Sequence, residues 1–102
     1  MRPLVPLALL LTLPLTAAAD GLTNAYFLCD IFAKTGVSTE CLASHGLSTV
    51  DVIINTSEAE ARNVCSVMAK GMIDRKRSFG GWQLRIFAPE HAEEPLAVCL
   101  LK

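Results

Sequence analysis

The sequence lacks most of the patterns that identify a reaction. Its 102 residues contain no Cys-x-x-Cys pair and no Gly-x-Ser-x-Gly motif. The first absence argues against a thioredoxin-like redox pair or a zinc knuckle, and the second against a hydrolase nucleophile turn. The chain has only two histidines, and no pair of carboxylates has a spacing that indicates acid–base catalysis. We therefore expect a protein without a catalytic role, a cofactor or a metal.

An excess of charge of either sign is also missing. Residues 20–102 carry eight Lys and Arg against ten Asp and Glu, a formal net charge of −2. This balance gives no reason to expect nucleic acid or an anionic membrane as a partner. The sequence has no internal repeat and no low-complexity segment. Residues 20–102 are therefore expected to form a single domain.

Residues 1–19 have the composition of a secretory signal peptide. Arg2 supplies a positive start, Leu4 to Leu15 form an apolar run, and Ala17-Ala18-Ala19 fit the small-residue rule for cleavage. The apolar run is shorter than the ~20 residues that a membrane-spanning helix needs. We predict a cleaved signal and an exported chain, periplasmic or extracellular, with no membrane span after the signal is removed.

The centre of the chain is predicted to form a strand followed by a helix. Residues 49–55 alternate, with Val50, Val52 and Ile54 on one face. Ser57 and Glu60 have the spacing of a capping box at a helix start. Apolar residues then recur at three- and four-residue steps, which predicts one buried helix stripe; they are Ala61, Val64, Cys65, Met68 and Met72.

Other elements are expected on both sides of this unit. Residues 22–34 predict an apolar helix, and residues 39–44 a short second helix capped by Ser38. Residues 82–87 and 96–101 predict two strands, the second apolar on both faces. We therefore expect a small α+β domain in which the N-terminal helix and the short helix precede a β-α-β-β unit with a three-stranded mixed sheet. A doubly apolar strand favours the middle position, giving the order 1-3-2, and the order 1-2-3 is the alternative.

The even number of cysteines predicts two disulfides in an exported chain. Four cysteines allow three pairings. The short helix would bring Cys41 back over the end of the first helix, which favours Cys29–Cys41 and leaves Cys65–Cys99. Each bond is worth about 3–4 kcal/mol in the chain-entropy description.

A bond between Cys65 and Cys99 has a consequence for the sheet, because alternation then turns Val98 and Leu100 away from the helix. The far face carries an apolar strip that we take as a candidate interaction surface, formed by Ile53, Phe87, Leu96, Val98 and Leu100. Such a strip needs a cover on a soluble monomer. We favour the helix of residues 22–34 as this cover; the alternative is self-association or a partner protein.

A second candidate surface is a basic–aromatic cluster. It consists of Arg75, Arg77, Phe79 and Trp82. The simpler interpretation is structural, since cations after a helix complement its dipole and a tryptophan that starts an amphipathic strand packs in the core.

The two histidines, His45 and His91, fall in predicted loops. His91 has acidic neighbours that could bind a metal with it, but consecutive loop residues rarely converge on one ion, so we expect a solvated loop. The function expected from the sequence is that of an exported, non-catalytic binding or interaction domain. The alternatives are a structural subunit of a cell-envelope assembly, and a small hydrolase whose site would join His45 or His91 to a carboxylate.

Overall fold

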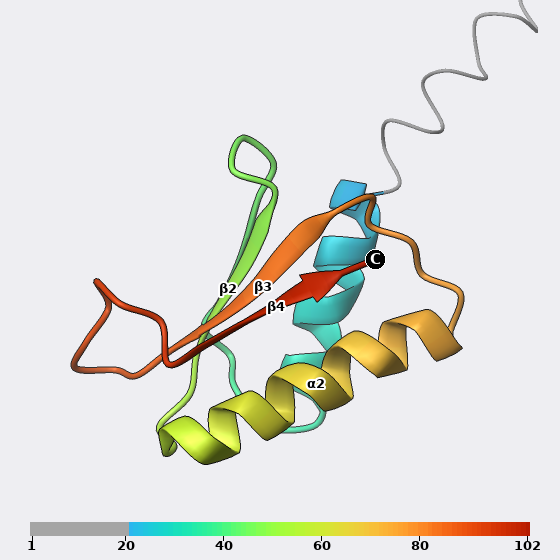
Figure 1. Cartoon of the computed structure of the whole chain (residues 1–102). Helices are drawn as coiled ribbons and strands as arrows, with labels where there is room; N and C mark the ends of the chain where they lie inside the picture. Colours follow the sequence, from blue (N-terminus) through green and yellow to red (C-terminus); the bar gives the residue numbers. More distant parts are fainter. Residues whose placement is uncertain (1–20) are drawn as a thin grey trace, which may run out of the picture.

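The computed structural model describes residues 21–102 (Figure 1). The predicted signal peptide lies outside these residues. Within them, no helix is long and apolar enough to cross a membrane. Residues 21–34 form the N-terminal helix. The elements that follow are β1 (Cys41–Ser44), β2 (Thr49–Ile53), α2 (Glu58–Asp74), β3 (Trp82–Phe87) and β4 (Ala97–Leu101). The expected α+β class is confirmed.

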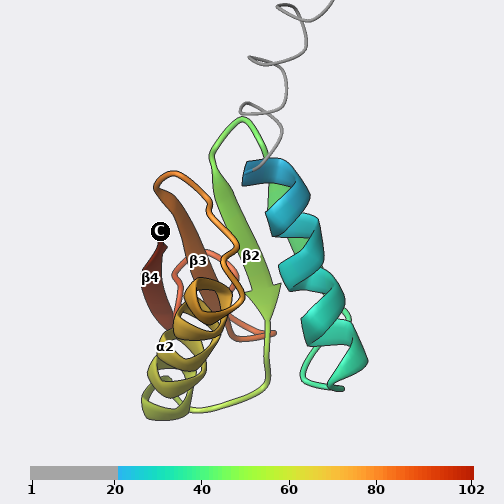
Figure 2. The ribbon, with the colours of Figure 1, turned by 90° about the vertical axis from the view of Figure 1, so that its right-hand side faces the viewer.

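The four strands form one mixed sheet in the order β1-β2-β3-β4. β2 and β3 are parallel, and both outer pairs are antiparallel. Figure 2 shows the N-terminal helix and α2 on the same side of this sheet, with the N-terminal helix toward β1 and α2 toward β4. We call this side the inner face. Its central residues are completely buried in the core shared with both helices; they are Val50, Val52, Leu84 and Ile86.

α2 begins at the cap that its sequence indicates, and backbone hydrogen bonds close its other end. The Ser57 hydroxyl accepts a hydrogen bond from the Glu60 N–H at 3.1 Å, which satisfies a free donor of the first turn. At the other end Lys76 has a φ of 59°, and the Arg77 N–H donates to the Met72 carbonyl at 2.8 Å. This hydrogen bond closes the last turn. The basic residues therefore follow the helix, rather than forming its last turn.

Residues 39–44 are not a helix as predicted, because β1 occupies Cys41–Ser44. A segment this short cannot repay the cost of helix nucleation, whereas pairing with β2 gives its backbone groups partners. The predicted cap has another role: the Ser38 hydroxyl donates to the Ile53 carbonyl at 2.6 Å and accepts from the Glu40 N–H at 3.0 Å. Ser38 thus joins the start of β1 to the end of β2.

The favoured strand order and the strand number are wrong. The sheet has four strands, and β4 lies at an edge instead of between β2 and β3, so the three predicted strands have the alternative order 1-2-3. β2 and β3 each carry a charged residue on the side away from the helices, Asp51 on β2 and Arg85 on β3. In the structure they pair with each other across β2 and β3, at 2.7 Å for both hydrogen bonds, so both strands can lie in the centre. The apolar β4 takes the edge position.

Both favoured disulfides are present, Cys29–Cys41 and Cys65–Cys99. The first explains why the N-terminal helix does not cover the far face as expected. Cys41 is opposite Val52 in the sheet register and therefore points to the inner face. Its bond to Cys29 holds the N-terminal helix on that face, where Phe32 is completely buried.

Candidate interaction surface

The other side of the sheet, which we call the outer face, carries no helix in the part of the chain that the structure describes (Figure 2). Strand alternation and the pairing register place two rows of side chains across it. One row runs Ser44, Thr49, Gln83 and Leu100, and the next runs Leu42, Asp51, Arg85 and Val98. In these two rows the central strands β2 and β3 carry polar side chains, β4 carries only apolar ones, and β1 carries Leu42 beside Ser44.

An ion pair occupies the centre of the outer face. The Arg85 Nε and Nη2 atoms donate to the two carboxylate oxygens of Asp51, both at 2.7 Å, and both side chains are largely shielded from solvent. The hydrogen bond to Asp51 and the charge of Asp51 raise the pKa of Arg85 above its ordinary value, against a lowering by partial burial. Because two parallel hydrogen bonds join the two side chains, this pair favours the observed register of β2 on β3.

A shallow hollow of about 410 Å³ lies beside this ion pair. Two residues of the predicted strip line it: Ile53, which is half-buried, and Phe87, which is buried. The Arg85 guanidinium lies 5.4 Å from the centre of the Phe87 ring. The hollow is mainly apolar, and the Asp51–Arg85 ion pair forms a charged border. Its remaining lining residues are Glu40, Cys41, Leu42 and Ala92.

The most exposed apolar residues of the strip are on β4. Val98 is 48% exposed and Leu100 is 53% exposed, and both point from the outer face of an edge strand. Leu96 does not join them. It precedes β4, packs partly against the core and borders a second depression beside Glu58. The structure therefore divides the predicted strip into a hollow over β2 and β3, an exposed β4 edge, and the separate Leu96.

The residues of the basic–aromatic cluster have structural contacts. Phe79 and Trp82 are buried, with ring centres 6.4 Å apart. The Arg77 guanidinium lies 3.9 Å from the centre of the Phe27 ring and donates to Asn24 at 3.3 Å. Arg75 donates to the last-turn carbonyl of Gly71 at 3.2 Å. Because both aromatic rings are buried, we place the candidate surface on the outer face of the sheet and not at this cluster.

The two histidines lie at opposite ends of the sheet. His45 is in the loop that leads into β2, and His91 is in the loop that follows β3. Because β2 and β3 are parallel, those loops are separated by the length of the strands. The depression beside His91 is lined by Glu58, Glu93, Glu94, Pro95 and Leu96. In residues 21–102 no three His, Cys, Asp or Glu side chains are placed to hold a metal ion.

Sequence reasoning missed two features of the outer face. Leu42 is 65% exposed there, and it was overlooked because its segment was interpreted as a helix. The Asp51–Arg85 pair was overlooked because the two strands were not expected to be neighbours. Residues 41–44 (Cys-Leu-Ala-Ser) show no apolar–polar alternation that would have identified a strand, and the available signal was that the segment is too short for a stable helix.

Comparisons with known proteins supply no relative for this chain: no protein-family model, no curated protein and no solved structure matches it.

Proposed function

We propose that this chain is an exported, non-catalytic domain that binds another protein through the outer face of its sheet. The observation that supports this most directly is the exposure of apolar side chains on β4. Val98 and Leu100 are about half exposed, on a face that no described helix covers. A group of exposed apolar side chains on one face is typical of an interaction site.

Export is supported by the cysteines. All four are in disulfides, and such bonds persist in oxidising compartments. The composition of residues 1–19 points the same way, since it predicts a signal peptide. A structural role in a cell-envelope assembly is a variant of the same proposal, because it would use the same surface for a permanent partner.

A hydrolase is less well supported. The depression beside His91 is the place where a histidine and carboxylates come together, and its lining includes Glu93 and Glu94. No serine, threonine or cysteine lines it to act as a nucleophile. We therefore favour binding over catalysis.

Site-specific photo-crosslinking tests the proposal. A photoreactive side chain is introduced at Gln83, which is exposed near the middle of the outer face, and the protein is irradiated in its native cells. The matched control carries the same group at Lys70, an exposed residue of α2. We expect discrete protein adducts from position 83 and none from position 70.

The masses of the adducts separate the outcomes. An adduct of a different protein, or of two copies of this chain, supports an interaction role for the outer face. Equal labelling from both positions, or no adduct from position 83, contradicts the proposal. The readout does not depend on knowing the partner in advance.

A further inference from the structure

We infer that the partner of the outer face and its β4 edge is a second copy of this chain, bound by antiparallel pairing of β4 with β4. This inference rests on the proposed function, because it names the partner for the same surface. It follows from three properties of β4: its free edge, its self-complementary side chains, and the opposite charges at its two ends.

The free edge is the first property. β4 has β3 as its only strand neighbour among the described residues, so one row of its backbone N–H and C=O groups faces away from the sheet. Figure 1 shows β4 in front of β2 and β3, with α2 below it and no described segment passing in front. Residues 97–101 contain no charged residue and no proline, the devices that usually protect such an edge.

The second property is self-complementarity. A two-fold axis beside Cys99 places Val98 of one copy opposite Leu100 of the other, and Ala97 opposite Leu101. Every cross-strand pair is then apolar, and no charge meets its own copy near the axis. On the outer face, the exposed Val98 and Leu100 of both copies form one continuous apolar group.

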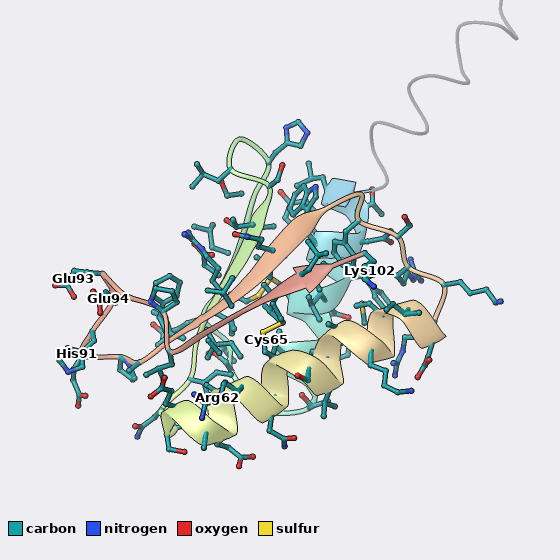
Figure 3. The ribbon with its side chains drawn as sticks, viewed as in Figure 1. Arg62, Cys65, His91, Glu93, Glu94 and Lys102 are labelled. Carbon is teal, nitrogen blue, oxygen red and sulfur yellow. A yellow bond between two sulfur atoms is a disulfide. The ribbon has the colours of Figure 1, made fainter. Side chains whose placement is uncertain are left out.

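The third property is the distribution of charge along β4. The loop before β4 carries Glu93 and Glu94, which lie in one depression with Glu58. Lys102 follows β4, and its carbonyl accepts a hydrogen bond from the Phe79 N–H at 3.3 Å, in the segment between α2 and β3. Figure 3 shows Glu93 and Glu94 beyond one end of β4 and Lys102 at the other.

This charge distribution selects the direction of pairing. Antiparallel pairing brings Lys102 of one copy opposite Leu96 of the other, next to Pro95 and Glu94. Opposite charges then meet at both ends of the interface. Parallel pairing would bring acidic end to acidic end and basic end to basic end, which is unfavourable.

Sedimentation velocity of the purified oxidised protein over a dilution series tests the inference. We expect a concentration-dependent equilibrium between monomer and dimer. Leu100→Asp should raise the dimer dissociation constant about tenfold or more, because it places a carboxylate in an apolar interface. Leu100 is chosen because its β3 neighbour is the uncharged Gln83, whereas Val98 lies beside Arg85. The matched control is Leu47→Asp, at an exposed leucine of the loop between β1 and β2, which should leave the dimer unchanged.

Charge exchange tests the direction of pairing with variants that leave the apolar residues intact. Lys102→Glu and Glu94→Lys should each weaken the dimer about fivefold, since symmetry repeats the contact twice. The double variant should restore the dimer, because it exchanges the two ends.

A protein that stays monomeric at every concentration overturns the inference. So does a dimer that Leu100→Asp leaves intact, that Leu47→Asp disrupts equally, or that the double charge exchange fails to restore. A monomer that still gives adducts of another protein from position 83 retains the proposed function and rejects only the second copy.

Discussion

The two edges of the sheet are built alike on the inside and differently on the outside. On the inner face, Cys41 of β1 is bonded to the N-terminal helix and Cys99 of β4 to α2. On the outer face, β1 presents Leu42 beside the polar Ser44, whereas β4 presents Val98 and Leu100. The inner faces of both edges therefore serve stability, and only β4 has an apolar outer side suited to a partner.

The ends of the edge strands differ as well. Ser38 connects the start of β1 to the end of β2 through its hydroxyl. β4 has no such connection described here: an acidic loop with Glu93 and Glu94 precedes it, and Lys102 follows it. Short strands and local hydrogen bonds protect an edge, whereas apolar side chains promote pairing. This comparison indicates that a strand with apolar residues on both faces can occupy the edge of a sheet.

The largest expected effect is the loss of the disulfide under β4. The double variant Cys65→Ala, Cys99→Ala removes the crosslink between residues that are 34 positions apart, and should lower the free energy of unfolding by about 4 kcal/mol. Cys29→Ala, Cys41→Ala opens a separation of 12 and should cost about 3 kcal/mol. Urea unfolding of the oxidised proteins measures both. A greater loss from the second pair would show that β1 depends more on its staple than β4 does.

Two neighbouring leucines separate the faces of β4. Leu101 is completely buried on the inner face, so Leu101→Ala should destabilise the fold by about 2–5 kcal/mol. Leu100 is 53% exposed, so Leu100→Ala should change the stability of dilute protein by no more than about 0.5 kcal/mol. Thermal and urea unfolding of both variants provide the measurement. Similar losses from the two leucines would contradict the assignment of faces.

The elements with strong local signals were predictable from the sequence. The helix stripe with Ala61, Cys65 and Met72, and the capping residue Ser57, depend on neighbours close in the chain. The favoured disulfide pairing is confirmed, although the argument for it used a short helix that the structure replaces by β1. Once Cys99 is paired with Cys65, alternation places Val98 and Leu100 on the opposite face of β4.

The strand order was not predictable in this way, because it depends on contacts between distant residues. The Asp51–Arg85 pair spans 34 positions, and neither residue alone indicates that the other neutralises it. The rule that places an apolar strand in the middle of a sheet assumes that both of its faces are buried within one chain. β4 instead lies at the edge, with one face exposed. The bond from Cys41 of β1 holds the N-terminal helix on the inner face. The wrong prediction of a helix for residues 39–44 therefore also led to the wrong face for the N-terminal helix.

The smallest effect concerns the hydroxyl that closes the β1 edge. Ser38→Ala removes the hydrogen bonds to Ile53 and Glu40, and should lower the free energy of unfolding by about 1 kcal/mol. The control is Thr39→Ala, at an exposed neighbour. Hydrogen exchange should also become faster at the Ile53 amide, which donates to the Glu40 carbonyl at 3.0 Å. The central amides of β3 should keep their relative protection, because a local opening of β1 does not require β3 to separate from β2. Equal losses from both variants would mean that backbone pairing, rather than Ser38, holds this edge closed.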